Sequence, residues 1–225
     1  MTGPTYPEAV VLLHGLCRTR RSMIPMDRAL AAEGFLVRNV GYPSRTRSIA
    51  ELADQVIPEA LAGCRGAGAR TIHFVTRSMG GILVRAWAAK ERIPDLGRVV
   101  MLGPPNQGSE VVDVLRRRWI FGKLNGPAGR ELGTGADSTP NRLGPVTFPL
   151  GIIAGDRSVN WINSLWIQGD DDGKVSVERT RVAGMTDHVV VHAAHPLLMR
   201  DARAIRQTIR FLRTGGFDHA PADRR

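Results

Sequence analysis

Short apolar runs alternate regularly with amphipathic stretches along this chain of 225 residues. Ala9–Leu13 is a continuous apolar run, typical of a strand that is buried on both faces of a sheet. Because strands that alternate with helices form parallel sheets, we predict an α/β fold with about six mostly parallel strands, flanked by helices. The expected strands are Ala9–Leu13, Phe35–Val40, Thr71–Val75, Val99–Leu102, Leu150–Ala154 and His188–His192.

The segments between these strands carry helical patterns of apolar residues. The last one has a single apolar stripe with spacings of three and four, and Gly215–Gly216 ends it. The glycines of "GAGAR" follow a helix and precede a strand, the reverse of a phosphate-binding loop, so we predict an ordinary turn there. The expected helices are Ser22–Glu33, Ile49–Leu61, Met79–Lys90 and a last helix bearing Leu198, Ala202, Ile205, Ile209 and Leu212.

One long segment, Asn106–Phe148, does not follow this alternation and is rich in Gly, Pro, Thr and Asn. Long insertions in α/β enzymes tend to be lids or binding loops, so we expect a lid-like insert, with a surface excursion of no function as the alternative. Its Trp119 and Phe121, together with Trp161 and Trp166, are candidates for a substrate pocket. Packing in the core is the alternative for these aromatic side chains.

The formal net charge is +10, and arginine supplies nearly all of it. Such a balance is common in proteins that bind nucleic acid or anionic membranes. Here the arginines are scattered, with one tight cluster at Arg116–Arg118. We therefore predict an Arg-rich soluble surface with no nucleic-acid partner and at most weak contact with anionic interfaces.

The length suits one α/β domain or two small ones, and we expect a single domain over residues 1–225. No apolar run reaches the roughly 18–20 residues of a membrane helix, and the start of the chain lacks the features of a signal peptide. We expect a cytoplasmic protein, or the mature form of a secreted one. Cys17 and Cys64 form no C-x-x-C, so two reduced, partly buried thiols are expected, with one disulfide as the alternative.

Ser78 stands between a strand and a helix, in "VTRSMGG". Strand, sharp turn and helix form the context of a nucleophile elbow, whose usual pattern is G-x-S-x-G. The crowded turn favours small residues two positions either side of the serine; Gly80 meets this demand, Gly81 reinforces it, and Thr76 replaces the first glycine. We predict that Ser78 is a nucleophile, with a generic strand end as the alternative.

A serine nucleophile needs a base, and the base needs an acid that holds its tautomer. His195 lies between the last strand and the last helix, at the same sheet edge as Ser78, and is the preferred base, with His192 as the alternative. Asp172 in "DGKV" is the preferred acid, because the tight turn can aim its carboxylate inward. Its neighbours in the "GDDDG" run, at positions 170 and 171, are expected to be solvated.

An acyl-transfer site also needs donors for a developing oxyanion. We expect the backbone N–H groups of Met79 and Leu16 to serve, with Gly15 allowing the backbone to approach. His14 is expected to brace this loop, and His14 and Arg77 are further candidates for the substrate pocket. The acidic run fails the calcium-loop pattern, because Gln168 and Arg179 would occupy its first and last positions, so we predict no metal and no cofactor.

These segments, "VVLLHGL", "VTRSMGG", "DGKVSVE" and the histidine before "PLLM", resemble the lipase/esterase branch of the α/β-hydrolase superfamily. The chain is most similar to compact bacterial lipase-like esterases that lack the superfamily's first two strands. The resemblance runs from about Ala9 to Phe217 and implies a triad of Ser78, Asp172 and His195. In that group Thr often replaces the first elbow glycine. Where relatives often carry His beside the nucleophile, this chain has Arg77, which either alters the preference for substrate charge or contacts only solvent.

The expected activity is that of a serine carboxylic-ester hydrolase, an esterase or lipase acting on short- to medium-chain esters through an acyl-enzyme. An acyltransferase or thioesterase with the same triad is an alternative, as is a binding protein on an inactive hydrolase scaffold. The expected partner is a small-molecule or lipid-like ester.

Overall fold

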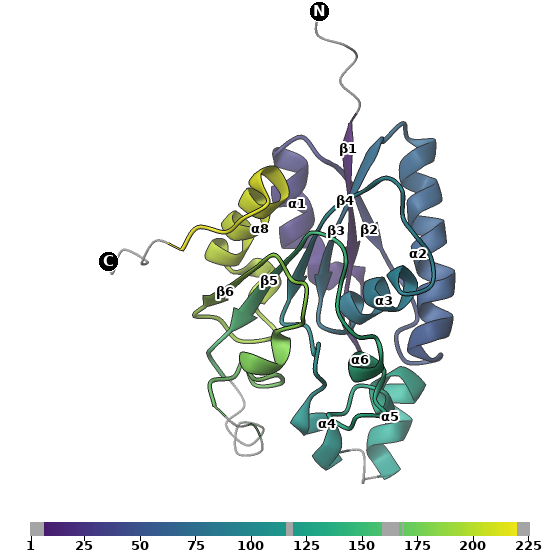
Figure 1. Ribbon diagram of the computed structural model, residues 1–225, viewed down its shortest axis with the longest axis vertical. Coiled ribbons are helices and arrows are strands. Elements are labelled where there is room, and N and C mark those ends of the chain that lie inside the picture. The colour runs from purple at the N-terminus through teal and green to yellow at the C-terminus, as the bar shows by residue number, and fades with distance from the viewer. Residues whose placement is uncertain (1–6, 116–118, 159–166, 168, 220–225) are drawn as a thin grey trace, which may run out of the picture.

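The computed structural model describes residues 7–115, 119–158, 167 and 169–219. Six strands form one sheet in the order β2-β1-β3-β4-β5-β6, and every neighbouring pair is parallel (Figure 1). The predicted six-stranded α/β fold is therefore confirmed, and its mostly parallel sheet is parallel at every pairing described. The strands are β1 (Glu8–Leu13), β2 (Leu36–Val40), β3 (Thr71–Arg77), β4 (Leu96–Leu102), β5 (Leu150–Gly155) and β6 (Asp187–Val191).

Helices follow the strands as the sequence pattern predicts, with differences at their ends. The helix expected over Ile49–Leu61, which includes Pro58, extends past Leu61 to Gly66, and its capping box joins Ser48 and Glu51. The last helix starts later than expected, because the Asp201 side chain accepts the Ala204 N–H and caps it. The α-helices are α1 (Ile24–Ala32), α2 (Ile49–Gly66), α3 (Met79–Ala88), α4 (Glu110–Leu115), α5 (Trp119–Arg130), α6 (Thr139–Arg142) and α8 (Ala202–Thr214).

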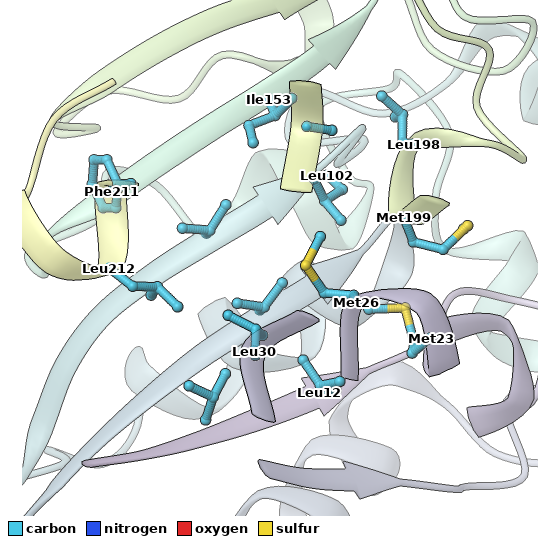
Figure 2. Close-up of a cluster of buried hydrophobic side chains, with 14 of the residues drawn as sticks. Leu12, Met23, Met26, Leu30, Leu102, Ile153, Leu198, Met199, Phe211 and Leu212 are labelled. Carbon is cyan, nitrogen blue, oxygen red and sulfur yellow. The ribbon is translucent and has the colours of Figure 1, made fainter. Parts of the chain in front are cut away.

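Two hydrophobic cores cover the two faces of the sheet, because alternate strand residues point to opposite sides. Val10 and Leu12 of β1 belong to one cluster with Met26 and Leu30 of α1 and with Phe211 of α8, and Figure 2 shows Leu12 beside Met26 and Leu30. The intervening residues Ala9, Val11 and Leu13 face the opposite side, in one cluster with side chains of α2 and α3. Both faces are buried, which explains why the strands read as continuous apolar runs rather than as alternating ones.

The strand order reverses between β1 and β3. The chain passes from β1 to β2 on one side, and then returns to place β3 on the other side of β1. In parallel sheets of this kind, the loops that leave the carboxyl ends of the two strands diverge at this point and leave a crevice for a ligand. The loop from His14 onward and the turn at Ser78 both lie at this switch point.

Segment 106–148 contains α4, α5 and α6, which lie together beyond one end of the sheet (Figure 1). Arg85 of α3 holds this segment at its base. Its guanidinium donates to Asn106 O and Oδ1, at 3.0 and 3.1 Å, and to the carbonyl oxygens of Pro140 and Gly144, at 3.1 and 2.8 Å. Arg85 is buried, and this burial lowers its pKa to about 10. A role of the segment as a lid stays a prediction.

No helix among the described residues is long and apolar enough to cross a membrane. Cys17 and Cys64 form no disulfide with each other, as expected; Cys64 is buried, whereas Cys17, expected to be partly buried, is exposed.

We predict that Arg85→Met lowers the free energy of unfolding by about 3 kcal/mol or more, because it leaves several buried carbonyl oxygens without donors. Urea denaturation followed by circular dichroism measures this change. Arg92→Met, at an exposed arginine shortly after the same helix, is the matched control and is expected to change stability by less than about 0.5 kcal/mol. Equal stability of both variants would contradict the bracing role of Arg85.

Candidate active site

Ser78 connects β3 to α3 in a strained backbone conformation, with φ 52° and ψ −124°. Among the described residues other than glycine, Cys17 is the one other with positive φ. Non-glycine residues rarely adopt such angles, and they tend to do so at functional sites where the surroundings enforce them. The Ser78 N–H donates to Leu102 O of β4 at 2.9 Å, which fixes the turn against the sheet.

The glycines after Ser78 allow α3 to start close to the sheet. A Cβ on Gly80 would lie 2.7 Å from Leu13 O and 2.9 Å from His14 O, and one on Gly81 would lie 2.8 Å from Met101 Sδ. Thr76 is fully buried beside Gly81 and fits within the sheet. The small residues predicted around the serine are thus placed where the backbone of α3 meets β1 and β4.

His195 and Asp172 form a buried pair at the carboxyl edge of the sheet. His195 Nδ1 lies 2.6 Å from Asp172 Oδ2, and the His195 N–H donates to Asp172 O at 2.9 Å. Asp172 Oδ1 accepts the backbone N–H groups of Lys174 and Val175, each at 3.0 Å. Both carboxylate oxygens of Asp172 therefore have donors, and the imidazole is held by side chain and backbone.

The other two aspartates of the acidic run have different surroundings. Asp170 is exposed, as expected. Asp171 is buried, and its Oδ1 accepts the Gly173 N–H at 2.6 Å. The prediction that Asp171 is solvated is therefore wrong: its carboxylate closes the same turn that directs Asp172 inward.

Arg77 connects the serine turn to the histidine loop. Its Nε and Nη2 donate to His195 O, at 3.3 and 3.1 Å, and its side chain is only 3% exposed. The alternative in which Arg77 contacts only solvent is therefore wrong. Burial, together with the charge of Arg18, lowers the pKa of Arg77 to about 10, so its guanidinium is protonated at neutral pH.

The electrostatics around His195 favour the neutral imidazole. Burial lowers the pKa of His195, the neighbouring Asp172 opposes this shift, and the charges of Arg77 and Lys174 add to the lowering. A neutral ring with Nδ1–H directed at Asp172 leaves Nε2 as an acceptor.

The alternative base is placed elsewhere. His192 is 75% exposed, and its Nδ1 lies 2.9 Å from Asp156 Oδ1 at the surface. His73, expected to be structural, is buried within β3 and accepts the Arg98 N–H at 2.8 Å. Of these histidines, His195 shares a pocket with Ser78.

His14 braces the loop after β1 from behind. Its Nδ1 lies 2.9 Å from Gly15 O, Nε2 accepts the Tyr42 N–H at 3.3 Å, and the ring stacks on Tyr42 with centroids 4.1 Å apart. Tyr42 Oη donates to His14 O. Because both ring nitrogens are used and the ring is buried, His14 lies outside the pocket lining, which corrects its assignment as a pocket residue.

The two backbone amides expected to hold an oxyanion are available. Neither the Leu16 N–H nor the Met79 N–H donates a hydrogen bond within the described chain. A Cβ on Gly15 would lie 3.1 Å from Ser78 Cβ, so this glycine lets the loop after β1 approach the serine. The Cys17 N–H, in contrast, is already bonded to Ser44 Oγ.

Ser78 and His195 line one pocket of about 220 Å³. Its wall combines apolar side chains of segment 106–148, including Val111, Val112 and Leu132, with the basic side chains of Arg18, Arg77 and Lys174. A larger depression of about 880 Å³ beside α2 contains none of the predicted site residues.

The aromatic candidates for the pocket are not placed by the structure. Trp161 and Trp166 lie outside the described residues. Trp119 and Phe121 belong to α5, and their side chains lie outside the described part of the chain.

Two residues of the site were missed by sequence reasoning. Gly103, with φ +54°, follows β4, and a Cβ there would lie 2.9 Å from Asp172 Oδ2 and 3.0 Å from His195 Nδ1. Ser109 Oγ donates to Lys174 O at 2.7 Å and so ties segment 106–148 to the Asp172 turn. The glycine directly after a buried strand, in "MLGPP", was the available signal for Gly103; nothing local marks Ser109.

We predict that Gly80→Ala lowers the free energy of unfolding by about 2 kcal/mol, because the added methyl group would overlap backbone carbonyls that cannot rotate away. Gly66→Ala is the matched control at a helical glycine, since a Cβ there meets no atom within 4 Å. It is expected to be neutral or slightly stabilising. Urea denaturation compares the two variants, and a stable Gly80→Ala protein would refute the close approach.

The fold is shared with bacterial enzymes of known structure. No protein-family model and no curated protein sequence matches the chain. The Bacillus licheniformis lipase BlEst2 in its mature form superposes with a TM-score of 0.75 at 18% identity, covering 94% of each chain. A structure from work on the metagenome-derived lipolytic enzymes LipS and LipT superposes with a TM-score of 0.61 at 17% sequence identity, covering 93% of this chain and 96% of the other. A thermophilic esterase from Thermogutta terrifontis superposes with a TM-score of 0.58 at 19% sequence identity, covering 94% of this chain and 92% of the other. The chain therefore has the α/β-hydrolase fold of bacterial lipases and esterases.

Proposed function

We propose that this protein is a serine carboxylic-ester hydrolase with Ser78 as nucleophile, His195 as general base and Asp172 as the acid that orients it. The observation that carries the proposal is the buried His195–Asp172 pair, with 2.6 Å between Nδ1 and Oδ2, because His195 lines the same pocket as Ser78. The strained backbone of Ser78 supports the assignment, since such strain concentrates at functional sites. Fold alone would not support it, because one fold hosts many activities.

In the proposed reaction, His195 Nε2 takes the proton of Ser78 Oγ as the oxygen attacks the ester carbonyl. The free N–H groups of Leu16 and Met79 stabilise the negative charge that develops on the carbonyl oxygen. The C–O bond to the alcohol then breaks, and the alcohol leaves with the proton held by His195. A water molecule, deprotonated by the same imidazole, attacks the acyl-enzyme and releases the acid.

Asp172 acts through His195. Its Oδ2 fixes the tautomer that carries hydrogen on Nδ1, and its negative charge stabilises the imidazolium formed in each step. The Lys174 and Val175 amides hold the other oxygen, so the carboxylate cannot rotate away from the ring.

The size of the pocket supports short- to medium-chain esters. A volume of about 220 Å³ is below the range of pockets that enclose drug-sized ligands. Val111, Val112 and Leu132 supply an apolar wall for an acyl chain. Transfer of the acyl group to another acceptor, or cleavage of a thioester, would use the same residues, and product analysis with competing alcohols or thioesters separates these reactions.

We predict that Ser78→Ala lowers kcat on p-nitrophenyl butanoate by up to about 10⁶-fold, the scale of removing a triad nucleophile. Ser22→Ala, at a serine of the 3-10 turn before α1, is the control and is expected to retain activity. Mass spectrometry after fluorophosphonate treatment should show one added phosphonyl group on Ser78 in the wild type. Undiminished hydrolysis by Ser78→Ala would refute the proposal, and an inactive, unlabelled wild type would favour a binding protein.

We predict that kcat/KM on a neutral ester stays on its plateau as the pH falls below about 6.5, the ordinary pKa of histidine. The lowered pKa of His195 keeps the imidazole neutral there, and activity is lost only as the pH falls through that lowered value. Lys174→Gln removes one of the charges that lower this pKa, so its acidic limb should move to higher pH. This account would be contradicted if kcat/KM of the wild type fell to half its plateau above pH 6.5. It would also be contradicted if Lys174→Gln left the pH of this half-maximal activity unchanged.

A further inference from the structure

The charged side chains that line the pocket around Ser78 are all basic among the described residues. Arg18, Arg77 and Lys174 line it, and no aspartate or glutamate belongs to the lining among the described residues. These side chains come from three separate segments: the loop after β1, the end of β3 and the turn after Asp172. A general excess of arginine on the surface does not explain why three distant segments direct cations to the same pocket.

Arg77 is the buried member of this group. Buried charges in proteins are normally paired with an opposite charge. Arg77 instead uses Nε and Nη2 on the neutral carbonyl of His195, and its Nη1 has no hydrogen-bond partner among the described residues. Its charge is therefore held inside the site without an ion pair.

Arg18 and Lys174 are exposed residues that line the pocket, and neither side chain makes a hydrogen bond or ion pair with another described residue. Desolvation at the pocket wall lowers the pKa of Lys174, and the charges of Arg18 and Arg77 add to this lowering. The nearby carboxylate of Asp172 partly offsets these charges, but both its oxygens are already engaged.

The basic side chains elsewhere include several that meet carboxylates. Arg65 pairs with Asp95, Lys90 with Asp54, and Arg213 with Glu8. Mutual repulsion of unpaired cations costs free energy in the free protein, and a bound anion removes that cost. The binding of an anion in this pocket is therefore favourable.

We propose that the natural substrate is an anionic ester, with a carboxylate or phosphate group bound by Arg18, Arg77 and Lys174 while its carbonyl faces Ser78. This inference rests on the proposed hydrolase function and narrows its substrate class. The anion can belong to the acyl part or to the alcohol part of the ester, and the test contains one arm for each.

The test compares two matched pairs of chromogenic esters at low ionic strength. The acyl arm uses p-nitrophenyl hydrogen adipate against p-nitrophenyl methyl adipate. The alcohol arm uses 5-butanoyloxy-2-nitrobenzoate against p-nitrophenyl butanoate. We expect kcat/KM to favour the anionic member of at least one pair by about tenfold, and the preference to shrink as added salt screens the charges.

The variants Arg18→Gln and Lys174→Gln remove one cation each. The ratio of kcat/KM for the anionic ester to that for the neutral ester is expected to fall about two- to fivefold in each, and further in the double variant. Using the ratio within one protein cancels any general loss caused by a disturbed loop. Lys90→Gln removes the same charge outside this pocket and should leave the ratio unchanged within about twofold.

Two further arms separate the sources of the anion. Stronger competitive inhibition of neutral-ester hydrolysis by inorganic phosphate than by glutarate supports a phosphate ester, and the reverse supports a carboxylate. Hydrolysis of the neutral esters with no anionic preference in either pair, no inhibition by either anion and an unchanged ratio in the variants would overturn the inference while leaving the hydrolase function intact. A wild type that hydrolyses none of the four esters would instead refute the proposed function.

Discussion

The close approach of backbone at the turn between β3 and α3 is the constraint on which the site depends. A serine with φ 52° does not hold this conformation by itself, so the surroundings must supply the energy. They do so through the position of β3 between β1 and β4 in the sheet and through the glycines that seat α3 against both neighbours. The geometry of one hydroxyl group thus follows from the packing of three strands and a helix.

Arg77 extends this constraint to the other half of the site. It stands one residue before the serine and bonds to the carbonyl of His195, so a displacement of one loop would be transmitted to the other. The Asp172 turn is joined to the same loop by the His195 N–H and to segment 106–148 by Ser109. The serine, histidine and aspartate come from distant parts of the chain, and hydrogen bonds to backbone carbonyls keep them in one arrangement.

Much of the fold could be predicted from the sequence, because buried strands and amphipathic helices have strong local patterns. These patterns predicted the central residues of the strands and the turn at Ser78. His195 was predicted because it follows the last strand, at the same edge of the sheet as Ser78, and Asp172 because it lies in a tight turn. Features set by tertiary contact were not visible. The extension of α2 past Leu61 to Gly66, the burial of Asp171 and the position of His14 behind the pocket were not predicted. The roles of Arg77 and Gly103 likewise exist only once separate loops meet.

Arg85 has a consequence for how such a chain can diversify. Its single guanidinium holds Asn106 near the start of segment 106–148, and Pro140 and Gly144 near its end. Both ends of the segment are therefore hydrogen-bonded to one side chain of α3. The attachment of the segment to α3 is made at its two ends, so a change of sequence between Asn106 and Pro140 leaves this attachment in place. The apolar wall that Val111, Val112 and Leu132 provide can then differ in sequence while both ends of the segment stay bound to Arg85.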